Sequence, residues 1–253
     1  MMSISDINKL LKEADGDEKL SAFISDFSGD DRGGVQKLVL TAQKRLDALH
    51  AEIERIHKMQ SYEKENEAFG YLCGIDEVGR GPLAGPVYAA AVILPKDVDI
   101  LYLNDSKKLS EKKREELYDV IMEKAVSVGI GFSTCERIDE INILQATYEA
   151  MTKAVNSLQV KPGALLIDAV HIPQLEEYKQ VSIIKGDAKS VSIAAASIVA
   201  KVTRDRLMLE YDKQYPEYGF ASNKGYGSAE HIAALKKYGP CPIHRKSFIG
   251  NFV

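Results

Sequence analysis

Apolar and polar positions follow two different patterns along the chain, and the change between them falls near residue 67. Before residue 35, short apolar clusters are separated by acidic, glycine-containing breaks, which predicts two short helices. From Val35 to Ile56, apolar residues recur every three or four positions, which predicts a longer helix that packs on the first two. A polar joint follows at 61–68. We therefore predict a helical N-terminal extension over residues 1–66 and a main domain over residues 67–253.

The main domain combines short apolar runs with amphipathic segments. The runs and alternations typical of strands lie at 71–75, 87–94, 126–132, 164–167 and 181–184. The spacings typical of helices lie at about 110–125, 139–158, 190–215 and 228–238. Three adjacent strands followed by alternating helices and strands indicate an α/β fold, with a mixed sheet flanked by helices.

Acidic residues follow three of these predicted strands. They are Asp76 with its neighbour Glu77, then Asp168, then Asp187. If the strands are neighbours, the carboxylates meet at one end of the sheet, where α/β folds place their sites. Converging carboxylates need a cation, and oxygen ligands without a His or Cys set favour Mg²⁺ or Mn²⁺ over zinc. Two such ions about 3.5–4 Å apart would clamp the attacking and leaving oxygens of a phosphoryl displacement.

Simpler explanations compete with this metal site. On a regular strand, Asp76 and Glu77 would point to opposite faces, so both reach one cation only where the strand ends or bulges. A single aspartate at a strand end is as often a loop cap as a ligand, and an acidic pair beside glycines is commonly a solvated turn. Four acids at such positions, some interrupting apolar runs where unpaired charge is expensive, favour a metal or catalytic role.

The most specific motif is the glycine-rich segment after the first strand. Its sequence, Asp76-Glu77-Val78-Gly79-Arg80-Gly81 followed by Leu83-Ala84-Gly85-Pro86-Val87, closely resembles the opening motif of the type 2 ribonucleases H, specifically bacterial ribonuclease HII. Further matching elements follow in the family's order: Asp105-Ser106-Lys107, Gly225-Tyr226-Gly227 and His244-Arg245-Lys246-Ser247-Phe248. The resemblance spans roughly residues 70–250 and implies a ribonuclease H-like sheet.

The resemblance implies that the four acids are both catalytic residues and metal ligands. Asp76 would bridge two divalent ions, Mn²⁺ or Mg²⁺, with Glu77 and Asp168 on one ion and Asp187 on the other. A metal-activated water would cut 5′ of a ribonucleotide and leave a 3′-hydroxyl and a 5′-phosphate. The implied substrates are RNA–DNA hybrids and duplex DNA with embedded ribonucleotides, and the implied tasks are ribonucleotide excision and RNA primer removal.

The resemblance also implies which residues bind the substrate. The backbone of Gly79, Arg80 and Gly81 would recognise the 2′-hydroxyl from the minor groove. Tyr226 would stack on the deoxyribose just 3′ of the ribonucleotide, although an isolated Gly-Tyr-Gly is usually a turn. The remaining candidates for phosphate or substrate contacts are Ser106, Lys107, Lys189 and Ser197.

Lys189 and Ser197 lie near the start of a predicted helix, where backbone donors favour anions. Ser197 stands in an alanine-rich stretch, where a serine more often serves tight packing. His244 and Arg245 are predicted to be structural, and a proton-shuttle role for His231 and His244 stays open.

Charge and composition limit the function classes without excluding a nucleic-acid substrate. The net charge of −4 divides into −4 for residues 1–70, −5 for 71–184 and +5 for 185–253. This division is compatible with cations in one place and phosphates in another. No apolar run approaches the roughly 20 residues that cross a bilayer, and three separated cysteines suit a reducing cytosol. We expect a cytoplasmic monomer that does not bind membranes.

Two other hypotheses stay open. The sister enzyme ribonuclease HIII shares the fold and the acids but prefers longer RNA tracts, and it usually carries a β-rich N-terminal domain. The predicted helices of residues 1–66 and Tyr226 argue against it. A catalytically inactive hybrid-binding module would gain nothing from four mutually repelling carboxylates. The sequence does not specify the preferred metal, the protein partners or the role of residues 1–66.

Overall fold

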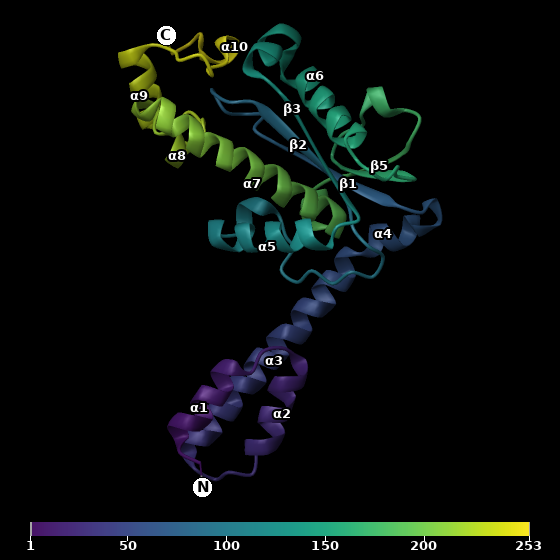
Figure 1. Cartoon of the computed structure of the whole chain (residues 1–253), viewed down its shortest axis with the longest axis vertical. Coiled ribbons are helices and arrows are strands. Elements are labelled where there is room, and N and C mark those ends of the chain that lie inside the picture. Colours follow the sequence, from purple (N-terminus) through teal and green to yellow (C-terminus); the bar gives the residue numbers. More distant parts are fainter. Residues whose placement is uncertain (1, 253) are drawn as a thin grey trace. The chain divides into compact units, whose positions relative to one another are not determined.

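The computed structural model of the protein describes residues 2–252. The chain forms two compact units that divide between Lys58 and Met59 (Figure 1). The helices are α1 Ile4–Glu13, α2 Asp17–Phe27, α3 Gly33–Met59, α4 Ser61–Asn66, α5 Glu111–Lys124, α6 Cys135–Asn156, α7 Val191–Gln214, α8 Phe220–Asn223, α9 Ala229–Tyr238 and α10 Lys246–Ile249. The strands are β1 Leu72–Val78, β2 Val87–Ile93, β3 Ser127–Ser133, β4 Ala164–Asp168 and β5 Lys179–Ile183. The predicted domain boundary at residue 66, the last residue of α4, stays a prediction.

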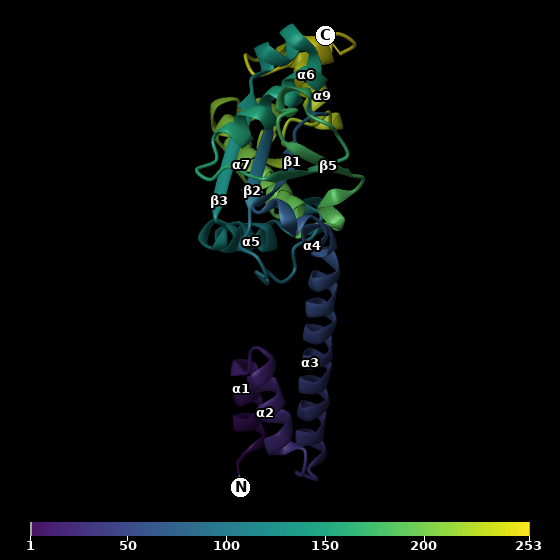
Figure 2. The same ribbon diagram turned by 90° about the vertical axis from the view of Figure 1, so that its right-hand side faces the viewer.

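In the N-terminal unit, α1 and α2 pack beside α3 (Figure 2). The Ser3 side chain caps α1, and the Arg45 guanidinium donates to the carbonyls of Leu11 and Ala14 at the end of α1, at 2.7 Å each. Buried apolar side chains from all three helices fill the space between them; among these are Ile7, Leu11, Leu20, Phe23, Ala42 and Leu46. The predicted pair of short helices on a longer one is confirmed.

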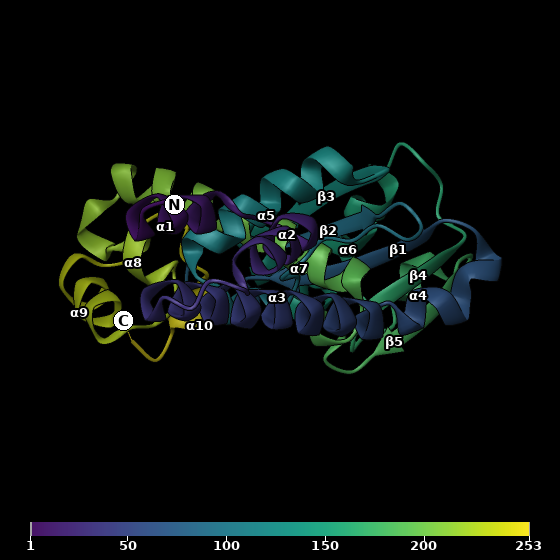
Figure 3. The same ribbon diagram turned by 90° about the horizontal axis from the view of Figure 1, so that it is seen from below.

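The described residues of the second unit form a five-stranded sheet in the order β3-β2-β1-β4-β5 (Figure 3). The strands β1, β2 and β3 are antiparallel neighbours, whereas β4 and β5 run parallel to β1. This mixed sheet confirms the predicted fold class. Its central strand, β1, is the one that carries Asp76 and Glu77.

Helix α6 covers one face of the sheet and α7 covers the other (Figure 1). Glycines on the strands allow both helices to approach closely. A Cβ at Gly131 would overlap the carbonyl of Ala150 in α6, and a Cβ at Gly74 would overlap the backbone of Ser192 in α7. The first half of α7 is alanine-rich and buried, and α5 packs on it from outside. The sheet is therefore sandwiched tightly, which fixes the strand ends that carry the acids.

The boundaries of β1 differ from the predicted run at 71–75. Pairing with β2 continues as far as Val78 opposite Tyr88, so the strand includes the acidic pair. Pairing with β4 stops at Ile75 opposite Ile167. The acidic pair therefore lies inside the strand on the β2 side and beyond its last paired residue on the β4 side. This half-ended strand places the two acidic residues at the end of the sheet, next to the carboxyl end of β4.

Two helices also differ from the sequence prediction. Helix α6 begins at Cys135, where the Thr134 side chain caps it, and it is interrupted at Asn142, whose φ is +68°. The Asn142 side chain accepts from the amides of Leu144 and Gln145 and so restarts the helix. The polar joint predicted at 61–68 is helical instead, as α4 and a short 3₁₀ turn. Within residues 2–252, no helix has the length and apolar character needed to cross a bilayer.

Candidate active site

The predicted acids gather at one end of the sheet. Because β1 and β4 are parallel and pair at Ile75 and Ile167, the residues that follow, Asp76 and Asp168, lie side by side. Asp187 follows the neighbouring strand β5, in the short 3₁₀ turn Gly186–Ala188. Topology therefore brings together carboxylates that are far apart in the sequence, at the carboxyl ends of three adjacent parallel strands.

The electrostatics of these acids show that they act on one another. Burial raises the pKa of the Asp76 carboxyl well above its usual range, and the charges of Glu77 and Asp168 raise it further. Burial also raises the pKa of Glu77, against the opposing effect of Arg80. The pKa of Asp187 is raised by burial and by the charges of its acidic neighbours, among them Asp168. The charged forms repel, so a bound cation would stabilise them.

The carboxylate oxygens are at present engaged by protein donors. The Glu77 amide donates to Asp76 at 2.7 Å, the Gly186 amide donates to Asp168 at 2.7 Å, and Arg80 lies 3.3 Å from Glu77. Within the described residues, no three His, Cys, Asp or Glu side chains form a ready-made set of metal ligands. The donor chemistry, carboxylates without His or Cys, fits a hard divalent cation.

A chain of hydroxyls supports Asp76 from α7. The Ser197 side chain hydrogen bonds to the Asp76 carboxylate, and its oxygen lies 3.0 Å from that of Ser106. Both serines are buried, so they link the acid to the Ser106–Lys108 turn. The charge of Lys107 opposes the rise in the pKa of both Glu77 and Asp187, so this lysine lies close enough to act on both acids. The substrate contacts predicted for these residues stay predictions.

Lys189 is less closely connected to this cluster. It is exposed at the end of the Gly186–Ala188 turn, and its amide donates to the Gly186 carbonyl. Among residues 2–252, no ion pair joins Lys189 to an acid. Its predicted role in substrate binding therefore rests on its position near the start of α7.

The structure places the Gly79–Gly81 loop beside Tyr226, although they are far apart in the sequence. A Cβ on Gly81 would lie 3.7 Å from the Tyr226 ring, and the Gly225 carbonyl accepts from the Leu83 amide at 2.8 Å. Gly79 has φ +90°, and a Cβ there would collide with Arg204 and lie 2.9 Å from the Pro86 carbonyl, so only glycine fits. The Tyr226 side chain is 41% exposed and can contact a ligand.

Two buried histidines form a hydrogen-bonded chain that ends at the backbone carbonyl of Tyr226. The Nε2 atoms of His231 and His244 lie 3.0 Å apart, and the Nδ1 of His231 lies 2.8 Å from the Tyr226 carbonyl. The Cys241 amide donates to the Nδ1 of His244 at 3.0 Å. Only one pattern satisfies all three contacts: His244 donates through Nε2 to His231, which donates through Nδ1 to Tyr226. Both rings are therefore neutral.

This neutral pair predicts a pH dependence of stability. Burial lowers the pKa of His244 to about 4, with a contribution from His231, and burial lowers the pKa of His231 as well. At a pH between the unfolded pKa near 6.5 and the lowered pKa of the folded chain, the histidines are protonated in the unfolded chain but not in the folded chain. The free energy of unfolding therefore decreases as the pH falls through this window. We expect His244→Asn to flatten the decrease of Tm between pH 6.5 and pH 4.5 by about 5 °C.

The measurement is thermal unfolding followed by circular dichroism at several pH values. His171→Asn, at an exposed position, is the matched control and should keep the wild-type slope. Equal slopes in the wild type and His244→Asn would show that the pair does not titrate in this window.

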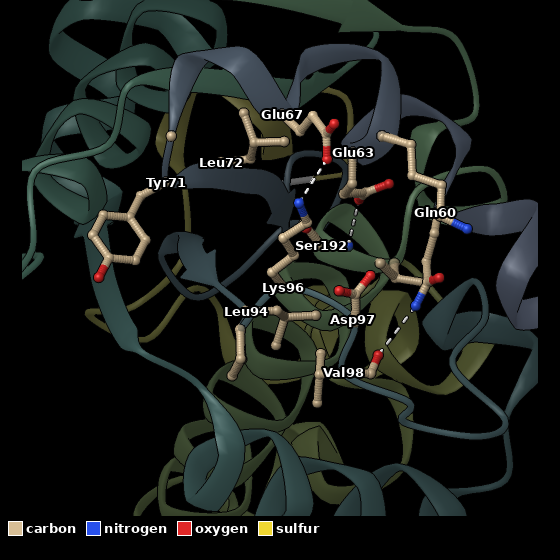
Figure 4. Close-up of a pocket in the computed structure, with 14 residues that line it drawn as sticks. Gln60, Glu63, Glu67, Tyr71, Leu72, Leu94, Lys96, Asp97, Val98 and Ser192 are labelled. Atoms are coloured by element: carbon tan, nitrogen blue, oxygen red, sulfur yellow. Dashed lines mark hydrogen bonds and ion pairs between the residues drawn. The ribbon is translucent and has the colours of Figure 1, made fainter.

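A cavity of about 350 Å³ lies elsewhere, between α4, the start of β1 and the start of α7 (Figure 4). The Glu63 carboxylate at its edge accepts from the Ser190 hydroxyl at 2.5 Å and from the Ser192 amide at 3.0 Å, which caps α7. Its apolar walls include Leu72, Leu94, Val98 and Val191. The cavity contains none of the predicted acids, because Leu72 and Asp76 are about 13 Å apart along the strand. It is separate from the candidate active site.

Two buried arginines were not recognised as part of the site from the sequence. Arg204 in α7 and Arg245 before α10 are fully buried, and both donate to backbone carbonyls around the Gly79–Gly81 loop. Arg204 stands next to Asp205 in a mixed-charge segment that looks like an exposed helix face. Arg245 lies in the C-terminal motif, where it is predicted to be structural. No local pattern distinguishes either from a surface arginine.

The fold and the acidic sheet end define a ribonuclease H-like α/β protein. Ribonuclease H2 from Pyrococcus horikoshii OT3 superposes with a TM-score of 0.59 at 30% identity, over 70% of this chain and 92% of that one. A chain of the PCNA:RNase HII complex from Archaeoglobus fulgidus superposes with a TM-score of 0.59 at 27% identity, over 70% of this chain and 94% of that one.

Sequence comparison identifies the family. The family model for ribonuclease HII matches residues 73–251, and the model for the ribonuclease HII N-terminal domain matches residues 3–67. Ribonuclease HII from Lachnoclostridium phytofermentans is 62% identical over 250 residues, which covers 99% of this chain and 98% of that relative. The chain belongs to the ribonuclease HII family, a family of endonucleases that act on RNA–DNA hybrids.

Proposed function

We propose that this protein is a divalent-metal-dependent endonuclease that cuts 5′ of ribonucleotides, both in RNA–DNA hybrids and at single ribonucleotides embedded in duplex DNA. The products would carry a 3′-hydroxyl and a 5′-phosphate. The observation that supports this proposal best is the juxtaposition of Asp76 and Asp168, with raised carboxyl pKa values at Asp76, Glu77 and Asp187. Such a cluster of anions destabilises the folded chain unless a cation neutralises it, and this favours a metal-binding role for the acids.

Asp76, Glu77, Asp168 and Asp187 would hold two divalent ions, Mn²⁺ or Mg²⁺. When bound, such ions supply an activated water and stabilise charge on the phosphate. The remaining residues orient the substrate. Ser197 fixes the Asp76 carboxylate, Lys107 offers a positive charge beside the acids, and the Gly79–Gly81 loop with Tyr226 presents a surface for the ribonucleotide. We also propose that the protein acts as a cytoplasmic monomer in ribonucleotide excision and primer removal.

The test is cleavage of two substrates: a DNA duplex with one ribonucleotide, and an RNA–DNA hybrid. Each is incubated with Mg²⁺, Mn²⁺ or a chelator. Metal-dependent nicking 5′ of the single ribonucleotide supports the proposal in full. Cleavage of the hybrid alone would assign the specificity of ribonuclease HIII. Binding of both duplexes without cleavage under any metal would favour the inactive binding module.

We expect Tyr226→Ala to reduce kcat/KM on the single-ribonucleotide duplex by about tenfold, a loss of about 1.4 kcal/mol, because the contact of the ring with the deoxyribose would be removed. The loss should be smaller on a long RNA–DNA hybrid, in which many alternative positions can be cut. The measurement is steady-state cleavage of both substrates. Tyr238→Ala, at an exposed position on α9, is the matched control and should behave as wild type. Equal losses on both substrates would contradict the junction-reading role of Tyr226.

A further inference from the structure

Arg245 is a buried cation whose guanidinium donates four hydrogen bonds to backbone carbonyls of one loop. It is 0% exposed, and its guanidinium donates to Gly79 at 2.5 Å, to Arg80 at 2.8 Å and to Gly85 at 2.6 and 2.9 Å. Among residues 2–252, no carboxylate forms an ion pair with it. Burial of a guanidinium without an acid costs free energy, and the hydrogen bonds to the loop carbonyls offset that cost.

These contacts fix the direction of two peptide planes. In a trans peptide, the carbonyl of one residue and the amide N–H of the next point in opposite directions, and the described chain contains no cis peptide. Because Arg245 draws the carbonyls of Gly79 and Arg80 inward, the amides of Arg80 and Gly81 are directed outward. Within residues 2–252, neither amide donates to an acceptor. Two adjacent donors are thus held ready for an external oxygen.

Arg245 itself is rigidly held. Its amide donates to the Leu83 carbonyl at 2.8 Å, and its guanidinium lies 5.1 Å from the Phe248 ring. The Asp139 carboxylate accepts from the amides of Lys246 and Ser247 at 2.8 and 2.9 Å, which anchors the segment that follows. The planar fork is therefore fixed before any substrate binds.

A second buried arginine supports the far side of the same loop. Arg204 donates to the carbonyls of Pro86, Ala84 and Lys224, at 3.0, 3.1 and 2.9 Å. The two guanidinium groups repel, and burial together with Arg204 lowers the pKa of Arg245 to about 10, so Arg245 stays charged at neutral pH. Their combined positive potential beneath the loop favours an electronegative oxygen or a phosphate above it.

We propose that Arg245 is a positioning residue for ribonucleotide selection: it orients the peptide planes of residues 79–81 so that two amides meet the 2′-hydroxyl oxygen. This inference rests on the proposed function, since it explains how the loop distinguishes RNA from DNA. Lysine cannot replace the fork, because one compact ammonium cannot span three carbonyls on two sides of the loop. The residue acts through the loop and does not itself touch the substrate.

The experiment compares the full-length wild type with Arg245→Lys and with Arg206→Lys, a control at a half-exposed arginine that pairs with Glu115. Affinity is measured in Ca²⁺ for a DNA duplex with one ribonucleotide and for the same all-DNA duplex. We expect Arg245→Lys to lower the ribo-to-deoxy affinity ratio at least tenfold, with all-DNA affinity within twofold of wild type. Arg206→Lys should keep both values.

A second readout does not depend on nuclease activity. The amides of Leu83 and Gly85 donate to the carbonyls of Gly225 and Ile243, and their hydrogen exchange reports loop order. We expect exchange at these amides to accelerate at least tenfold in Arg245→Lys, while exchange in β1 and β2 stays unchanged.

The outcomes separate the two proposals. An unchanged affinity ratio in Arg245→Lys, or equal losses on both duplexes, would overturn the positioning role. If the wild type shows neither cleavage nor preference for the ribonucleotide, the proposed function fails. Exchange then still decides whether Arg245 orders the loop: acceleration confined to the loop supports that role, and global acceleration or no change overturns it.

Discussion

Asp76→Asn should reduce cleavage by about 10³-fold or more while affinity for the hybrid stays close to wild type. Asparagine keeps the shape of the side chain and an oxygen that can accept from the Glu77 amide, but it removes the negative charge with which Asp76 would hold a cation in the proposed site. The same change should raise the Tm of the metal-free protein. Burial and the neighbouring charges raise the pKa of Asp76, so its ionised form opposes folding.

Three measurements together define this result: cleavage in Mn²⁺, hybrid binding in Ca²⁺, and Tm with and without Mn²⁺. Mn²⁺ should raise the Tm of the wild type more than that of Asp76→Asn. Asp119→Asn, at an exposed position on α5, is the matched control and should leave all three unchanged. Cleavage within tenfold of wild type in Asp76→Asn would remove Asp76 from the proposed metal site.

Gly74→Ala should destabilise the second unit by about 3 kcal/mol and also reduce activity. The added Cβ would overlap the backbone of Ser192 and Ile193 at the start of α7. Backbone atoms in a buried helix cannot move aside as the end of a flexible side chain can, so the helix has to shift from the sheet. Such a shift would displace Ser197 and with it the support of Asp76.

Urea unfolding measures the free-energy change, and cleavage of the single-ribonucleotide duplex measures activity. Gly33→Ala is the control, because a Cβ there meets nothing within 4 Å at the start of α3. If the free energy of unfolding of Gly74→Ala lies within 0.5 kcal/mol of the wild-type value, the close approach of α7 to β1 does not require a glycine at position 74.

The sheet and the layers could be predicted from the sequence because their signals are local. Apolar runs, Ser110 and the alanine-rich start of α7 each specify an element within a few residues. The break at Asn142 could not be predicted, because an asparagine inside a helical pattern commonly stays helical. The extension of β1 past Ile75 was missed because it depends on where β2 and β4 stop pairing, which is a tertiary property.

The candidate site divides in the same way. Strand ends and family resemblance predict the four acids, and their role stays a prediction. The family motif predicts that His244 and Arg245 are structural, but no sequence pattern indicates which groups they contact. Arg204 and Arg245 are buried by carbonyls from distant segments, and the contact of His231 with His244 depends on the packing of α9 and the C-terminal segment. Long-range hydrogen bonds of this kind have no periodic or compositional signature.

Glu63 caps α7, so the helix that covers one face of the sheet depends on a residue that precedes the first strand. Helix α4 lies inside the matched N-terminal family region, yet its Glu63 carboxylate accepts from Ser190 and Ser192 at the start of α7. A shortened chain beginning at residue 67 would therefore keep every strand and the four acids of the candidate site but leave those donors without Glu63. Helix α4 therefore belongs to the N-terminal family region by sequence and to the sheet domain by its hydrogen bonds. In evolutionary terms, α4 could not be exchanged for an unrelated linker without loss of the cap on α7.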